Sequence, residues 1–463
     1  MSPNETINGV KAPTGEPLTA HTQWAAHWIR KAIADIEDKA PTSILATEKA
    51  DTRHLLLVDG TLQQPDVDDS VKDEIKEFNI GIVGAGAAGL FTAMILDHLN
   101  EKYNLNARYE ILGANSDDRL GCRLFSYCFK DDNGKPLGPH QYFDVGAMDR
   151  TFELFNEVGM KTPIDPAKPK PGDLIPYYFS RDAIQTTSDN INANEFKITG
   201  LPERIASANP GDLIKDQIGF WTDLYENNPK EFWKGLTSQL DQFSVFSFSN
   251  QAVSEMILES IDFDHDKPWH CVEGGAQEIA KHMLAKLNPN SFLNEGTPVL
   301  YQKSVKAISY ITEGERKRVQ VTVRGEEHQP PRVYHAVLNW APLGAWNWSS
   351  DPTSVGALAY FGPGQFQSMY PGLTKTDGKH IIIGETASAH HAWVGGALES
   401  AVRGVYQFLF KHSKRSIAAH RATRAYNRDE VRKPFGPLPY EYDRTKEVGV
   451  APGGCAGGGK GGV

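Results

Sequence analysis

Apolar residues in the central part of the chain follow a pattern that predicts a parallel α/β unit. The segment "NIGIV" (79–83) has the composition of a buried strand, and after a glycine-spaced turn the small apolar residues from Ala87 to Leu99 have helical spacing. The segment "RYEIL" (108–112) then predicts a second strand. A strand, a helix and a strand in this order are typical of one βαβ unit.

Further elements are predicted on both sides of this unit. Helical periodicity dominates residues 213–286, and a final strand and helix are predicted over 379–411. Before the βαβ unit we expect a helix over 21–38 and an acidic, turn-rich link over 65–77, and the glycine-rich end of the chain is expected to be disordered. Three more strands are predicted over 299–311, 317–325 and 335–343.

The turn between the first strand and the first helix has the spacing of a dinucleotide-binding turn. Gly84 permits the tight turn, Gly86 lets the backbone approach a pyrophosphate, and Gly89 lets the helix pack closely on the strand. The pyrophosphate would sit at the helix N-terminus, where free N–H groups and the helix dipole favour negative charge. Such spacing also arises from packing alone, but the flanking strand and helix favour a nucleotide site.

Composition and charge narrow the class of protein. The chain has 463 residues, of which 40% are hydrophobic and 23% charged, so we expect two or three globular domains. A net charge of −10 argues against a nucleic-acid or anionic-membrane partner. The four cysteines lack metal-ligand spacing, and the N-terminus lacks the pattern of a signal peptide. We therefore expect a cytoplasmic protein with no transmembrane segment and no metal.

Several separate motifs together resemble the flavin amine oxidase family, and most closely its fungal L-amino-acid oxidases. The resemblance covers residues 75–410, and its most specific motif is "IIIGETASAHHAWVGGALESAVRG" (381–404). The other motifs are "IGIVGAGAAGLFTA", "RLGCRLFSY", "YFDVGAM", "WHCVEGGAQEIAKHM" and "FGPGQF".

The resemblance implies FAD as cofactor. Glu385 is similar to the acidic residue that accepts hydrogen bonds from hydroxyls of the flavin chain, and Val305 matches the position whose backbone holds the adenine. The turn with Arg123 resembles the one that passes over the cofactor phosphates. The full set of cofactor-binding residues expected on these grounds is Gly84, Ala85, Gly86, Ala88, Gly89, Arg119, Gly121, Arg123, Gly146, Ala147, Met148, Val305, Gly384, Glu385, Trp393, Gly396 and Ala397.

The resemblance also implies the fold class and its division along the chain. We expect an α/β, two-domain flavoprotein, with a Rossmann-like FAD-binding domain on a parallel or mixed sheet and an inserted, largely helical α+β substrate domain. The FAD-binding domain would comprise residues 75–160, 265–345 and 375–412, and the substrate domain 161–264 with a remnant at 346–374. Extensions at 1–74 and 413–463 complete the chain.

In the related oxidases a neutral amine gives a hydride from its α-carbon to the flavin, the imine is hydrolysed, and dioxygen reoxidises the flavin to give hydrogen peroxide. Trp393 occupies the aromatic position beside the flavin, although a core position is the alternative. His390 and His391 are more simply explained as structural. The partners implied are a small amine or amino acid and dioxygen, with a homodimer as candidate assembly.

Two residues depart from the family pattern. Gly113 stands where an acid usually binds the ribose hydroxyls, and Glu110 lies about 10 Å earlier along the strand, too far to substitute. Asp117 or Asp118 is a hypothetical replacement. Asp149 stands where the amino-acid oxidases have an arginine for the substrate carboxylate; Arg150 could be recruited, but it more simply begins a helix.

A stretch of the substrate domain is also missing, because "VLNWAPLGA" (337–345) runs almost directly into "WNWSSDPTSVGALAYFGPGQF" (346–366). The function predicted is therefore an FAD-dependent L-amino-acid oxidase, with two alternatives left open. One is a monoamine, polyamine or secondary-metabolite amine oxidase, and the other is an inactive or truncated flavin-binding paralogue.

Overall fold

The structure is a computed structural model of the chain. It describes residues 75–126, 129–130, 136–137, 141–144, 149–160, 177–179, 184–186, 192–194, 199–240, 252–262, 269–272, 274–314, 316–340, 358–413, 416–419 and 421–422. Several expected segments lie outside the described residues. They are the helix over 21–38, most of the link over 65–77, the junction at 341–357 and the glycine-rich end of the chain.

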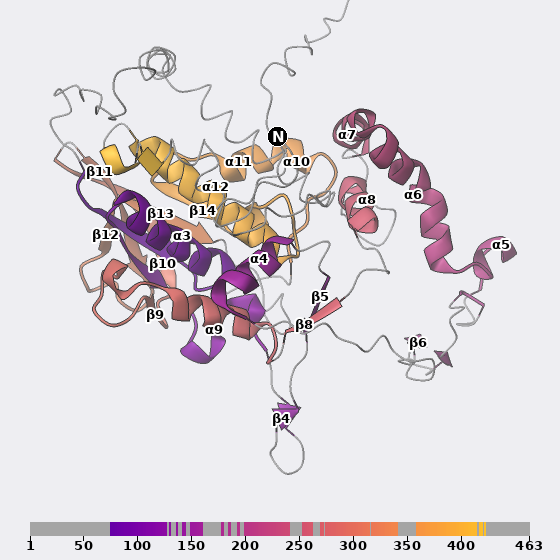
Figure 1. Cartoon of the computed structure of the whole chain (residues 1–463), viewed down its shortest axis with the longest axis horizontal. Coiled ribbons are helices and arrows are strands. Elements are labelled where there is room, and N and C mark those ends of the chain that lie inside the picture. Colours follow the sequence, from indigo (N-terminus) through magenta and orange to yellow (C-terminus); the bar gives the residue numbers. More distant parts are fainter. Residues whose placement is uncertain are drawn as a thin grey trace, which may run out of the picture.

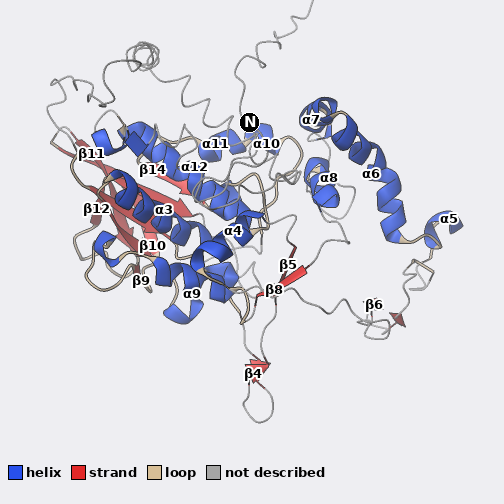
Figure 2. Cartoon of the chain, in the orientation of Figure 1, coloured by secondary structure: helices blue, strands red, loops and turns tan. Residues whose placement is uncertain are grey.

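A parallel sheet of five strands forms the centre of the described structure (Figure 1, Figure 2). Every pair of neighbouring strands in it is parallel; Ile82, for example, lies between Leu338 and Ile111. The sheet confirms the expected Rossmann-like α/β fold class. In order across the sheet the strands are β14 (His380–Ile383), β13 (Ala336–Trp340), β1 (Phe78–Val83), β2 (Ala107–Leu112) and β9 (Val299–Leu300).

Helices pack on one face of this sheet and form the main hydrophobic core with it. The helix α3 (Ala87–Tyr103) follows β1 directly and ends at Asn104, whose φ of 53° stops the helix in the left-handed conformation. The helices α12 (Val394–His412) and α9 (Gln277–Lys286) pack against α3, and α4 (Asp149–Val158) packs against α12 and α9. This layer covers the apolar side chains of β1, β2, β13 and β14.

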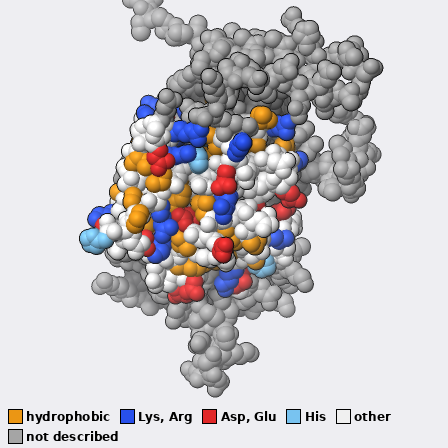
Figure 3. Space-filling model, turned by 90° about the vertical axis from the view of Figure 1, so that its left-hand side faces the viewer, with side chains coloured by type: hydrophobic (Ala, Val, Ile, Leu, Met, Phe, Trp, Pro, Cys, Tyr) orange, Lys and Arg blue, Asp and Glu red, His pale blue; other side chains and the backbone are white. Residues whose placement is uncertain are grey.

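A small antiparallel sheet packs on the other face. It consists of β10 (Val305–Glu313), β11 (Arg316–Val323) and β12 (Arg332–Tyr334). The Tyr334 ring lies where a side chain at Gly81 would extend, 2.8 Å from where a Cβ would be, so only glycine fits there in β1. The molecular face drawn in Figure 3, at the left of Figure 1, carries Lys and Arg side chains interspersed with Asp and Glu.

The strand predicted over 299–311 is in fact two strands in two different sheets, β9 and β10. Between them the chain turns, with Gln302 at a φ of 57°. The N–H groups of Gln302 and Lys303 donate to the carbonyls of Asn115 and Gly113, over 2.9 and 2.7 Å. These bonds tie the turn to the loop after β2 and break the strand.

A second group of helices lies on the opposite side of the molecule from the antiparallel sheet (Figure 1). It comprises α5 (Glu203–Ala206), α6 (Pro210–Asn227), α7 (Pro229–Ser238) and α8 (Val253–Asp262). A separate hydrophobic core joins α6, α7 and α8 to α10 (Gln365–Ser368) and α11 (Tyr370–Thr374), and it includes Phe232, Leu258 and Phe366. The predicted helical character of 213–286 is confirmed for α6, α7, α8 and α9.

Shorter elements complete the description. Strand β8 (Trp269–Val272) interrupts the helical region 213–286 and pairs antiparallel with β5 (Gln141–Asp144). In the described part of the chain no helix is both long and apolar enough to cross a membrane. The remaining strands are β3 (Phe129–Lys130), β4 (Pro136–Leu137), β6 (Tyr177–Phe179) and β7 (Ile184–Thr186), and short 3₁₀ turns occupy Asp117–Arg119, Cys122–Leu124, Pro289–Ser291 and Glu385–Ala387.

Candidate functional site

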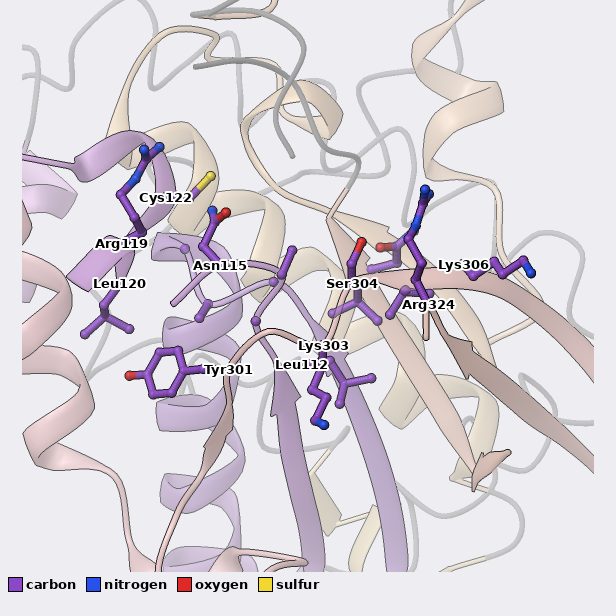
Figure 4. Close-up of a pocket in the computed structure, with 18 of the residues that line it drawn as sticks. Leu112, Asn115, Arg119, Leu120, Cys122, Tyr301, Lys303, Ser304, Lys306 and Arg324 are labelled. Atoms are coloured by element: carbon purple, nitrogen blue, oxygen red, sulfur yellow. The ribbon is translucent and has the colours of Figure 1, made fainter. Parts of the chain in front are cut away.

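A cavity of about 410 Å³ opens at the carboxyl ends of the central strands (Figure 4). Val83, Leu112 and Asn339 line it from the ends of β1, β2 and β13. In open α/β sheets ligands bind at this edge. The other lining residues are Gly84, Ala85, Gly86, Gly113, Ala114, Asn115, Arg119, Leu120, Cys122, Tyr301, Lys303, Ser304, Val305, Lys306, Ala307, Ile308 and Arg324.

The glycine turn has the geometry that its spacing predicts. Gly84 has a φ of 106°, and its N–H donates to the carbonyl of Leu112 over 2.9 Å. A Cβ at Gly89 would lie 2.0 Å from the Gly84 carbonyl oxygen, so α3 packs on β1 only because residue 89 is glycine. A Cβ at Gly86 would meet nothing closer than 3.8 Å. Gly86 therefore faces open space, and a ligand can approach the protein backbone closely there.

The segment after β2 lies directly against this turn. The Gly121 N–H donates to the Ala85 carbonyl over 3.0 Å, and Gly86 and Gly121 form an isolated parallel bridge. Gly121 has a φ of 90°, and a Cβ there would lie 2.9 Å from the side chain of Ala280. Arg119 lines the cavity and stacks its guanidinium over the Phe125 ring at 4.6 Å. The structure thus brings Arg119 and Gly121 beside the glycine turn.

An ion pair joins this segment to the C-terminal motif. Arg123 Nη1 lies 2.7 Å from Glu385 Oε2, and the Glu385 side chain is 5% exposed. The other oxygen, Oε1, accepts the backbone N–H groups of Ala359 and Ala392, each over 2.8 Å. Glu385 therefore holds three parts of the chain together, and its contact with a cofactor stays a prediction.

The start of α12 combines close packing with free backbone donors. A Cβ at Gly396 would lie 1.8 Å from the His390 carbonyl oxygen, whereas one at Gly395 would meet nothing closer than 3.8 Å. Half-buried Trp393 occupies the position before the first helical residue and makes no side-chain capping bond, and Ala397 is buried. The first N–H groups of any helix lack intrahelical partners, so this end can hold an anion.

Other predicted site residues lie elsewhere. Ala88 and Gly89 are buried within α3, and Gly384 precedes the 3₁₀ turn of Glu385 with a φ of 109°. Arg150 lies in the first turn of α4, as the simpler interpretation expected, and its side chain is not among those described. Gly146, Ala147 and Met148 lie outside the described residues.

The structure shows where the acidic residues near position 113 lie. The Glu110 carboxylate is engaged by other residues. It accepts hydrogen bonds from the Tyr334 hydroxyl and, over 2.5 Å, from Asn294 Nδ2, and it forms an ion pair with Arg332 at 3.3 Å. Asp117 and Asp118 are not among the residues that line the cavity. Near the end of β2, Asn115 lines the cavity.

Sequence reasoning missed the side chains that the 301–304 turn and β11 bring to the cavity. Lys303, Ser304 and Arg324 line it together with Tyr301. Burial, and then the charge of Asp117, raise the pKa of Tyr301, so its hydroxyl stays protonated and can donate a hydrogen bond. The only local sign of this wall is the polar stretch Gln302–Ser304 inside an otherwise strand-like segment, and it does not indicate a cavity.

The two histidines of the C-terminal motif are buried within protein. His391 Nδ1 lies 2.6 Å from Glu255 Oε1 of α8, and both side chains are at most 7% exposed. The His391 ring packs edge-on against Phe361 and stacks on Phe366. In this arrangement the His391 ring joins α8 to the C-terminal motif, and its structural role stays a prediction. Among the described residues no group of side chains could hold a metal ion.

Comparisons with known proteins identify related oxidases. The sequence is 47% identical to L-amino-acid oxidase 4 of Hebeloma cylindrosporum, over 72% of this chain and 82% of the relative. It is 22% identical to a putative bifunctional amine oxidase of Dictyostelium discoideum, over 73% of this chain and 47% of the relative. The chain thus spans about half the length of the Dictyostelium protein. No known family model matches the sequence.

The length of one alignment shows that this chain lacks segments that its relative has. The alignment with the Hebeloma oxidase extends over 535 positions, more than the 463 residues of this chain, so it contains gaps opposite segments that only the relative has. Among solved structures, a redesigned putrescine oxidase covers 57% of this chain and 58% of its own at 17% identity, with a TM-score of 0.34. That structural likeness adds nothing to the assignment.

Proposed function

This chain belongs to the flavin amine oxidase family, in its L-amino-acid oxidase branch, and from that premise we propose that it is an FAD-dependent oxidase of L-amino acids. The products would be a 2-oxo acid, ammonia and hydrogen peroxide. The observation that carries the proposal is the nucleotide cradle at the carboxyl ends of β1 and β2, in a chain 47% identical to a named L-amino-acid oxidase.

The described residues fit the ADP part of FAD. A Cβ at Gly86 would meet no atom closer than 3.8 Å, so there is room for a ligand. The N-terminus of α3, with its unpaired N–H groups and the positive end of the helix dipole, lies at the cavity. The cavity continues past Val305, whose backbone begins β10. Its volume of about 410 Å³ is within the range of cofactor sites, ~300–1,000 Å³.

The C-terminal motif would hold the flavin end. When bound, FAD supplies the acceptor for the hydride from the substrate α-carbon. The chain's own part is to place and shield that reaction. The backbone at the start of α12 would lie against the phosphate and ribityl end of the cofactor, and Trp393 would wall the substrate cage and exclude water. The Arg123–Glu385 pair would fix this motif relative to the cradle.

A second candidate function follows from Asp149, which stands where amino-acid oxidases have an arginine for the substrate carboxylate. A buried carboxylate without a cation is costly, whereas a simple amine needs none. If Arg150 does not reach the substrate, a monoamine or polyamine is the better substrate. The third candidate, a flavin-binding protein without activity, is favoured by the alignment gaps.

Turnover assays separate these candidates. The purified full-length chain, supplied with FAD, is incubated with L-amino acids, with the D-enantiomers as control, and with mono- and polyamines, while hydrogen peroxide and 2-oxo acid are measured. We expect peroxide and 2-oxo acid from L-amino acids alone. If only amines gave peroxide, the amine oxidase would replace the L-amino-acid oxidase as the proposed function. If no substrate gave peroxide, the inactive paralogue would be favoured.

We propose that the protein acts in the cytoplasm on a small molecule and dioxygen. We propose a homodimer as its assembly. The net charge of −10 and the mixed charges on the face in Figure 3 support small-molecule rather than nucleic-acid partners. Light scattering on the purified chain measures the assembly directly, and a monomer mass would remove the dimer.

A further inference from the structure

The charged side chains that line the nucleotide cavity beyond the glycine turn are all cationic. Four of its side chains are cationic, namely those of Arg119, Lys303, Lys306 and Arg324, and none of the described residues that line it is Asp or Glu. A dinucleotide site for an unphosphorylated ribose normally ends β2 with an acid that accepts the ribose hydroxyl. Here Gly113 occupies that position.

Backbone hydrogen bonds place these residues beside the end of β2. The Lys303 N–H donates to the Gly113 carbonyl over 2.7 Å, and the Arg324 N–H donates to the Ser304 carbonyl over 2.7 Å. Gly113, the 301–304 turn and the end of β11 therefore form one rim. Ser304, Asn115 and Arg324 bring a hydroxyl, an amide and a guanidinium to it.

The lysines and Arg324 differ in how they are engaged. Lys303 pairs with Glu326, and Lys306 pairs with Glu327 at 3.0 Å. Arg324 has no ion pair with any residue that the structure describes, and it is exposed. In Figure 4 the Lys303 side chain turns away from Asn115 and Ser304, whereas the side chains of Ser304 and Arg324 extend to the same side.

We propose that this rim binds the phosphorylated ribose of a 2′-phosphoadenosine nucleotide, the NADP class, in competition with the adenosine half of FAD. An arginine near the end of β2, in place of the usual acid, is how dinucleotide sites accommodate a 2′-phosphate. The guanidinium can bind two phosphate oxygens at once, and Ser304 and Asn115 can donate further hydrogen bonds. The proposal concerns which nucleotide the cavity selects, and so it goes beyond the oxidase activity.

Direct binding tests the proposal without any turnover. The full-length chain, stripped of flavin, is titrated in a calorimeter with 5′-ADP and, separately, with adenosine 2′,5′-bisphosphate. The bisphosphate should bind about tenfold more tightly, as expected for an added charge-assisted hydrogen bond. Because Arg324 is exposed, this preference should shrink as salt is raised. Equal binding, tighter binding of 5′-ADP, or no binding of either nucleotide would overturn the proposal.

Two variants assign the preference to the rim. Arg324→Ala should abolish the preference for the bisphosphate, and Lys281→Ala, which removes the same charge from a pair with Glu278 on α9, should leave it intact. Gly113→Glu should reverse it, since the new carboxylate accepts the free ribose hydroxyl and repels a phosphate.

Gly113→Ala controls for the added side chain, because a Cβ there makes only ordinary contacts at 3.4–3.7 Å. This variant should keep the wild-type preference. If Arg324→Ala keeps it as well, the rim does not recognise the phosphate and the proposal fails. Flavin content and peroxide production of the wild-type chain test the oxidase proposal independently.

Discussion

At the residue scale, two glycines of one turn have different physical roles. Gly89 has no room for a Cβ, which would lie 2.0 Å from the Gly84 carbonyl oxygen, whereas Gly86 faces the cavity. Gly89→Ala should therefore destabilise the fold by about 1–3 kcal/mol or more, the usual cost of overpacking. Gly86→Ala should fold with nearly wild-type stability and bind FAD weakly, because its methyl group occupies the path of the pyrophosphate.

Urea unfolding and FAD titration of the two variants check this division of roles. The control is internal, because each variant serves as the reference for the other. If Gly86→Ala bound FAD as tightly as the wild type, the cofactor would not approach at the glycine turn.

A half-buried histidine makes stability depend on pH. Burial, followed by the charges of Arg318 and Arg316, lowers the pKa of His335 from 6.5 to about 4. Its Nδ1 accepts the Asn79 N–H at the start of β1 over 3.0 Å. The unfolded chain thus binds a proton more readily than the folded one between these values, so this contribution to stability is complete above pH 6.5 and is lost as the pH falls towards 4.

Thermal unfolding at pH 7 and pH 5 measures this effect. His335→Asn should lose less of its unfolding temperature between the two pH values than the wild type does. Exposed His328 provides the matched control, and His328→Asn should behave as the wild type. An unchanged pH dependence in His335→Asn would contradict the role of His335.

Residue-level predictions succeeded where the signal was local. The conformations of Gly84 and Gly89 follow from their spacing between a strand and a helix. Lys303 and Arg324 were missed because nothing in their own sequence neighbourhood refers to a cavity. They reach it only because the 301–304 turn is bonded to the loop after β2, about 190 residues earlier along the chain.

At the element scale, a buried hydrogen bond connects α8 of the second helical group to the C-terminal motif. His391 and Glu255 meet at 2.6 Å, with both side chains at most 7% exposed. His391 immediately precedes Ala392, whose N–H is bonded to Glu385. The pair therefore fixes the position of α8 relative to the residues expected beside the flavin.

Glu255→Ala should destabilise the chain by about 1–3 kcal/mol, since it leaves the buried His391 without its partner. Glu278→Ala breaks an exposed pair with Lys281 and should cost at most about 1 kcal/mol. Chemical unfolding of both variants gives the comparison. Equal losses would show that the buried pair contributes no more than a surface pair does.

Secondary structure was predictable wherever an element lies in one layer. The patterns of β1, α3, β2, β14 and α12 are locally apolar and periodic, and the structure has them close to the expected residues. The single strand expected over 299–311 was wrong because β9 and β10 enter different sheets, although apolar residues occur on both sides of the break. Only the pairing partners distinguish β9 from β10.

At the scale of the whole molecule, two separate parts of the chain meet at the carboxyl edge of the parallel sheet. The glycine turn and the loop after β2 form the nucleotide cavity, and the Arg123–Glu385 pair joins them to the C-terminal motif. The alignment with the Hebeloma oxidase contains gaps, whereas these parts of the nucleotide site are present in the structure. Cofactor binding is therefore the property that the structure supports most strongly, and substrate oxidation depends on it.

The visible absorption spectrum of the chain supplied with FAD, recorded before and after anaerobic addition of L-amino acids, tests cofactor binding and substrate oxidation together. We expect the spectrum of a bound, oxidised flavin, which bleaches with L-amino acids and stays unchanged with the D-enantiomers. If the protein retained no flavin after removal of the excess, the proposed FAD site at the glycine turn would be contradicted. A bound flavin that no L-amino acid bleaches would leave the cofactor site standing and contradict the proposed oxidase activity.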